Sequence, residues 1–152
     1  MLHALLAIAH ALSSAAWFGS MFYSLTVMQP RAKRFFATDA EFEEFVATIA
    51  RGARWTVLGA FAFVAITGAG LIVVARPVPM TTAWLAILWA KLTLFTCAIT
   101  LFCHVSWVLW PRRIFAAPHE LPRIQWQFRV IGITLLIIAA LSFALGILPH
   151  TW

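Results

Sequence analysis

Four long apolar segments constrain this chain more than any other feature. They cover residues 2–28, 55–74, 82–110 and 130–148, and each approaches or exceeds the roughly 20 residues that a helix needs to cross a bilayer. Charged residues make up only 11% of the 152 residues, too few for an ordinary water-facing surface. The segments show no strand-like alternation and are too long for barrel strands. The sequence therefore predicts an all-α integral membrane protein, with residues 1–152 forming one domain, a four-helix bundle.

Basic residues predict how the four spans are oriented. Two loops carry nine of the lysines and arginines, namely Arg31, Lys33, Arg34, Arg51, Arg54, Arg112, Arg113, Arg123 and Arg129. Only Arg76 lies on the opposite side, and an excess of this kind marks the cytoplasmic side of a membrane. We therefore expect both loops to be cytoplasmic and both termini to lie on the outer, periplasmic side. The net charge of +6 suits anionic lipid headgroups, and we expect no nucleic-acid partner.

The first cytoplasmic loop contains the signals of a helix. Thr38 and Glu41 form a capping-box pattern, and Phe42, Phe45 and Ile49 follow at helical spacing. We expect a short interfacial helix in this loop, separate from the second span.

One face of the first span gathers its polar and sulfur-bearing side chains. Residues seven apart nearly superimpose on a helix, and this face combines His3, His10, Trp17 and Ser24 with the neighbouring Ser14, Met21 and Met28. The opposite face is mostly Leu, Ala and Ile, so we expect the polar face to point into the bundle. An ionisable ring in such a span either serves a function or is an interior histidine with a hydrogen-bond partner; for His10 both interpretations stay open.

Lys91 is the only charged residue well inside a span. At 1.5 Å per residue, Lys91 and His10 both lie ~12–13 Å below the outer end of their helices, so they can meet at one level. A charge at this depth usually marks function, although a lysine can also extend to the membrane surface. His104 lies ~20 Å lower, where we expect it to bond to backbone or headgroups rather than share a metal with His10.

Further sequence patterns limit the cofactors and the enzyme classes that this chain can represent. Gly68 and Gly70 in the second span would let a helix or a flat cofactor approach closely. The chain contains no phosphate-binding loop, paired zinc-ligand spacing or nucleophile elbow.

The first span resembles that of the haem-containing protoporphyrinogen oxidase family of the HemJ type. That family has a histidine, then six residues, then Trp-Phe, with Phe-Tyr a turn later; His10, Trp17, Phe18, Phe22 and Tyr23 match this spacing. The Lys-Leu pair that begins at Lys91 and the stretch "ITGAGL" in the second span are similar to two further motifs of the family.

This resemblance implies a redox protein of the bacterial inner membrane that binds haem b through His10. It implies a cofactor pocket formed by His10, Ser14, Trp17, Phe18, Met21, Gly68, Gly70 and Lys91. Lys91 would be the catalytic residue, paired with a propionate or a substrate carboxylate. The implied reaction is oxidation of protoporphyrinogen or electron exchange with a membrane quinone.

A second resemblance, to CopD-like copper-resistance membrane domains, rests on "RGARWTVLGAFAFVAITGAG", the Lys-Leu pair and "VLWPRR". It implies copper transport or handling, with imidazole and thioether ligands from His3, His10, Met21, Met28 and His150. A third interpretation is a non-catalytic membrane subunit whose polar face packs against a larger complex. We expect either a homo-oligomer or such a subunit.

Overall fold

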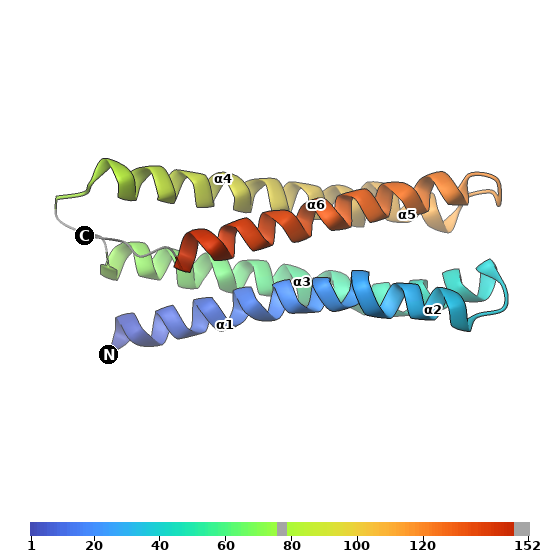
Figure 1. Ribbon diagram of the computed structural model, residues 1–152, viewed down its shortest axis with the longest axis horizontal. Helices are drawn as coiled ribbons and strands as arrows, with labels where there is room; N and C mark the ends of the chain where they lie inside the picture. Colours follow the sequence, from blue (N-terminus) through green and yellow to red (C-terminus); the bar gives the residue numbers. More distant parts are fainter. Residues whose placement is uncertain (76–78, 148–152) are drawn as a thin grey trace.

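The computed structural model describes residues 1–75 and 79–147, and within them all regular secondary structure is helical. The chain forms four long antiparallel rods (Figure 1). The first rod joins α1 (Leu2–Tyr23), the π-helix η1 (Ser24–Met28) and α2 (Gln29–Phe35); the second is α3 (Asp39–Ala75). The third joins α4 (Thr82–His104), the π-helix η2 (Val105–Leu109) and α5 (Trp110–Ile114); the fourth is α6 (Leu121–Ile147). Each rod is long and apolar enough to cross a membrane, which confirms the predicted all-helical class with four spans.

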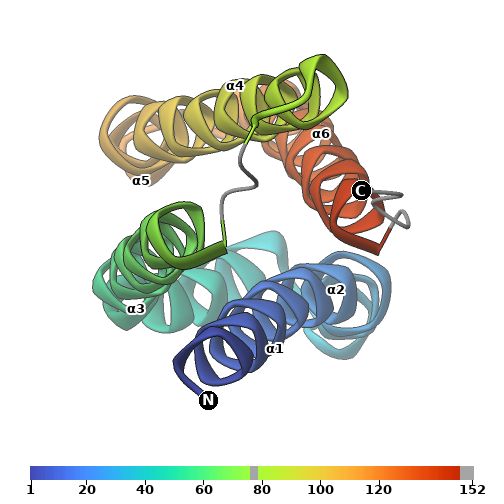
Figure 2. The same ribbon diagram turned by 90° about the vertical axis from the view of Figure 1, so that its left-hand side faces the viewer.

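The rods pack as two pairs. The first rod lies along α3, the third lies along α6, and contacts between α1 and α6 join the pairs (Figure 2). The start of α1 and the end of α6 share one end of the bundle, the terminal end, as Figure 1 shows. The α2–α3 and α5–α6 connections share the other, the loop end, with the nine basic loop residues in or near them. Arg76 lies outside the described residues.

The first and third rods continue past the predicted ends of their spans at residues 28 and 110. Pro30 and Pro111 stand just beyond these points, and a proline inside a helix lacks an N–H and crowds the preceding turn. One wider turn precedes each proline: the Gln29 N–H bonds to the Ser24 carbonyl, and the Trp110 N–H bonds to the Val105 carbonyl. These five-residue steps are the π-helices η1 and η2, which let each helix continue through its proline.

The predicted separate interfacial helix is wrong, although its start is confirmed. The capping box forms as expected: the Glu41 N–H donates to Thr38 Oγ1 over 3.2 Å, and the Thr38 N–H donates to Glu41 Oε2 over 3.3 Å. The helix that begins there, α3, then runs without a break into the second span. Gly52 is the only weak helix former near the expected boundary, and a single glycine costs about 1 kcal/mol, too little to end a long helix.

A small apolar core lies inside the bundle. It consists of Phe61, Ala98, Leu135 and Ile138. Many other large apolar side chains are exposed; Leu12 and Ile66, for example, are 66% and 69% exposed. An apolar surface of this extent fits a lipid environment rather than water.

Candidate cofactor site

The His10 ring is held against α3 by a hydrogen bond. His10 Nδ1 lies 3.0 Å from Oγ1 of Thr67, a side chain that is only 4% exposed. The Thr67 hydroxyl in turn donates to the Phe63 carbonyl over 2.8 Å. The bond joins the first two rods in the half of the bundle nearer the terminal end.

This arrangement favours one tautomer of His10, the one in which the Thr67 hydroxyl donates to a carbonyl of its own helix. A hydroxyl has one proton, and that of Thr67 is donated to the carbonyl of Phe63, so the Thr67 oxygen accepts from His10. Nδ1 therefore carries the proton, and Nε2 of the neutral ring keeps its lone pair. In this tautomer Nε2 of His10 is an acceptor, and the contact with Thr67 orients the ring from the other side.

The two glycines of the second span make room for α1. A Cβ atom at Gly68 would lie 3.2 Å from Cε1 of His10, and one at Gly70 would lie 3.2 Å from Cδ1 of Leu6. Glycine at these positions allows the close approach of the two helices. The surface of both glycines is therefore covered by the side chains of α1.

Lys91 reaches from α4 toward the last turn of α6. Its Nζ lies 3.5 Å from the position that a Cβ atom would take at Gly146. A cation near the C-terminus of a helix is favoured by the helix dipole. Lys91 is the tenth residue of α4 and His10 is the ninth residue of α1, each counted from the terminal end of the bundle. Across residues 1–75 and 79–147, no hydrogen bond or ion pair is found for the ammonium group.

The other predicted pocket residues of α1 are engaged in packing or within their own helix. Trp17 and Met21 pack against the apolar core, with the rings of Trp17 and Phe61 5.0 Å apart. Phe18 stacks on Phe22. The Ser14 hydroxyl donates to the His10 carbonyl over 2.8 Å, so it does not point freely into the bundle.

The residues of the copper alternative are spread along the chain. His3 is exposed near the start of α1, Met28 ends η1 and is half-buried, and His150 lies outside the described residues. Among the residues that the structure describes, no three His, Cys, Asp or Glu side chains come together as a metal-binding group.

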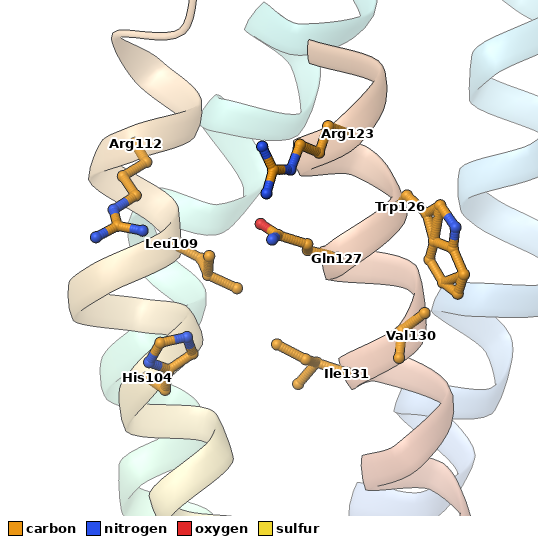
Figure 3. Close-up of a pocket in the computed structure, with 8 residues that line it drawn as sticks. All are labelled: His104, Leu109, Arg112, Arg123, Trp126, Gln127, Val130 and Ile131. Carbon is orange, nitrogen blue, oxygen red and sulfur yellow. The ribbon is translucent and has the colours of Figure 1, made fainter. Parts of the chain in front are cut away.

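His104 lies in a separate cavity nearer the loop end, between the third rod and α6 (Figure 3). The cavity has a volume of about 440 Å³ and is open to the surface. His104, Leu109 and Arg112 form one wall, and Arg123, Gln127 and Ile131 of α6 face them. The predicted separation of His104 from His10 along the bundle fits this position.

A polar network at the loop end was not predicted. Arg113 donates to both carboxylate oxygens of Glu43, over 2.6 and 2.8 Å, and Gln125 donates to the same carboxylate over 2.8 Å. Lys33 donates to the Gln125 side-chain oxygen over 3.2 Å. Burial raises the pKa of Glu43, but the hydrogen bonds from Arg113 and Gln125 and the charges of Arg113 and Lys33 outweigh it, so the pKa lies below its ordinary value.

Thr67 is the site residue that the sequence patterns missed. It lies inside the stretch "ITGAGL" of the second span, where a polar side chain in an apolar segment is the signal that points to it. No protein-family model, no curated protein and no solved structure significantly matches this chain. The resemblances to HemJ-type and CopD-like proteins therefore depend on the matched residues alone.

Proposed function

We propose that this chain is a haem b-binding membrane redox protein with His10 as the axial ligand. The observation that carries the proposal is the hydrogen bond from His10 Nδ1 to Thr67, because it leaves Nε2 as an acceptor. Histidine ligands of metals commonly donate their second ring nitrogen to a fixed partner, which orients the ring and raises its basicity. Haem b, when bound, supplies a one-electron couple whose potential depends on its axial ligand and on burial.

Lys91 supplies the second part of the proposed site. Its ammonium group lies against the last turn of α6 and has no ion-pair partner among the described residues. A carboxylate would neutralise it, and we propose a haem propionate or a carboxylate of a porphyrinogen substrate for this role. Oxidation of protoporphyrinogen or electron exchange with a quinone are the reactions that the resemblance favours.

The depth of His10 limits how many axial ligands this chain can give to one haem iron, because a second ligand must lie at a similar depth. His3 is one residue from the start of α1, and His104 faces the cavity nearer the loop end. We therefore expect a single axial ligand from this chain, with any second ligand coming from another chain in an oligomer or a larger complex.

An absorption spectrum and a metal analysis of the protein purified from membranes test the proposal. A reduced-minus-oxidised haem b spectrum, with haem stoichiometric to protein, is the expected result. Stoichiometric copper without haem would favour the CopD-like alternative. Absence of both would favour a non-catalytic membrane subunit and would reject the redox function.

A further inference from the structure

The cavity that contains His104 has no part in the proposed haem chemistry, yet its walls carry concentrated positive charge. Arg112 projects from α5 and Arg123 from the first turn of α6, on opposite walls of the cavity (Figure 3). No carboxylate lines the cavity within the described part of the chain. The first turn of α6 itself contains no acidic residue; Glu120 stands immediately before it.

Two acidic groups, Glu43 and Glu120, form other contacts. Glu43 is bound by Arg113, the neighbour of Arg112. Glu120, which immediately precedes α6, accepts a hydrogen bond from the Ala117 N–H over 3.0 Å. Arg112 and Arg123 are both exposed and have no ion-pair partner among residues 1–75 and 79–147, so their guanidinium groups can bind an anion.

The polarity of the cavity changes along the bundle. The two arginines lie toward the loop end, Leu109 and Gln127 lie next to them, and His104 and Ile131 line the part farthest from the arginines (Figure 3). Trp126 also borders the cavity and is 61% exposed. Exposed tryptophan is common at a membrane interface. A charged rim above a groove lined by Leu109, Ile131 and the His104 ring suits a molecule with an anionic head and an acyl chain.

We propose that this cavity binds the phosphate group of an anionic phospholipid from the cytoplasmic leaflet. Arginine binds phosphate oxygens through paired N–H donors, and basic pockets between spans on the cytoplasmic side attract anionic headgroups. The loop end is the side that the excess of basic residues predicts to be cytoplasmic. A free phosphate would use only the rim, whereas a phospholipid also fills the apolar walls below it.

Native mass spectrometry of the detergent-solubilised protein with added phosphatidylglycerol tests this assignment. The double variant Arg112→Gln/Arg123→Gln is expected to bind phosphatidylglycerol about 30-fold more weakly than the unaltered chain. The variant Arg112→Lys/Arg123→Lys keeps the charge and should recover part of the affinity. The matched control is Arg51→Gln/Arg129→Gln, which removes two exposed charges from the same end of the bundle outside the cavity.

Each part of the experiment distinguishes a phospholipid site at the cavity from another explanation of the binding. An equal loss in the control would show general attraction between the basic end and anionic lipid, and would overturn a site at the cavity. Full displacement of phosphatidylglycerol by millimolar inorganic phosphate would overturn the lipid assignment, because only the phosphate would then be recognised. Equal affinity for phosphatidylcholine, which has no net charge, would overturn it as well. Circular dichroism of each variant checks that the helices remain intact.

Discussion

The carboxylate of Glu43 and the guanidinium of Arg113 form a bidentate ion pair that connects the second rod to the third. Gln125 of α6 donates to the same carboxylate, and Lys33 of α2 donates to Gln125. One hydrogen-bonded network therefore contacts all four rods at the loop end. Arg113 also lies over the Phe128 ring, 4.9 Å from its centre, which fixes the guanidinium further.

Glu43→Gln should destabilise the bundle. The substitution removes the charge that three donors surround and leaves Arg113, whose side chain is 9% exposed, without its counter-charge. We expect a loss of about 2 kcal/mol, seen as a lower Tm in detergent. Glu44→Gln is the matched control, since Glu44 is exposed and forms no ion pair with any described residue. Equal Tm values for the two variants would contradict the stabilising role of the network.

The stability of the unaltered chain should depend on pH through Glu43. Its folded-state pKa lies below the ordinary value of 4.5, so the pair contributes fully above pH 4.5. This contribution is lost as the pH falls from 4.5 through the lowered pKa, because protonation removes the carboxylate charge. Melting curves recorded from neutral pH downward should therefore converge for the unaltered chain and Glu43→Gln at acid pH. A difference in Tm that stays constant across this range would contradict the assignment.

Thr67→Val should weaken cofactor retention more than it weakens the fold. Valine fills nearly the same space but cannot accept the Nδ1 proton of His10, so the ring loses its orienting partner. We expect about 10-fold or greater loss of bound haem, measured by titration of the apoprotein. Thr67→Ser keeps the hydroxyl and should retain most of the affinity. Haem affinity unchanged in Thr67→Val would show that Thr67 does not position the ligand.

Two glycine substitutions should have opposite effects although both lie in α3. Gly59→Ala adds a methyl group with no atom within 4 Å and should stabilise the helix by up to about 1 kcal/mol. Gly68→Ala brings a Cβ atom to 3.2 Å from the His10 ring, which must shift, so bound haem should decrease. Melting temperature and haem content of the two variants check this pair. A stabilised Gly68→Ala with full haem content would show that the ring has room to move.

The sequence predicted the spans well and their tertiary partners poorly. Apolar length alone identifies the four rods, but their ends depend on local hydrogen bonding: η1 and η2 carry the helices through Pro30 and Pro111, and α3 continues through Gly52. The helix bounds make His10 the ninth residue of α1 and Lys91 the tenth of α4, in keeping with the depths counted from the sequence. Helical rise is the same in any span, so depth can be counted from the sequence alone.

Helical rise gives the depth of a residue but does not predict which residues of different rods contact one another. The pairing of His10 with Thr67 depends on which face α3 turns toward α1, and that face is chosen by close packing at Gly68 and Gly70. Glu43 and Arg113 are 70 residues apart, and no local pattern joins them. The residues that tertiary packing brings together are therefore the ones that the sequence patterns missed.

The most direct test of the account compares the haem content of His10→Ala and His104→Ala, each purified in parallel with the unaltered chain. The two substitutions remove the same ring from two different depths of the bundle, and His104 lies beside two arginines that could also pair with propionates. Loss of the reduced haem b band in His10→Ala and its retention in His104→Ala is the predicted result. A full band in His10→Ala, or its loss only in His104→Ala, would contradict the assignment of His10 as the axial ligand.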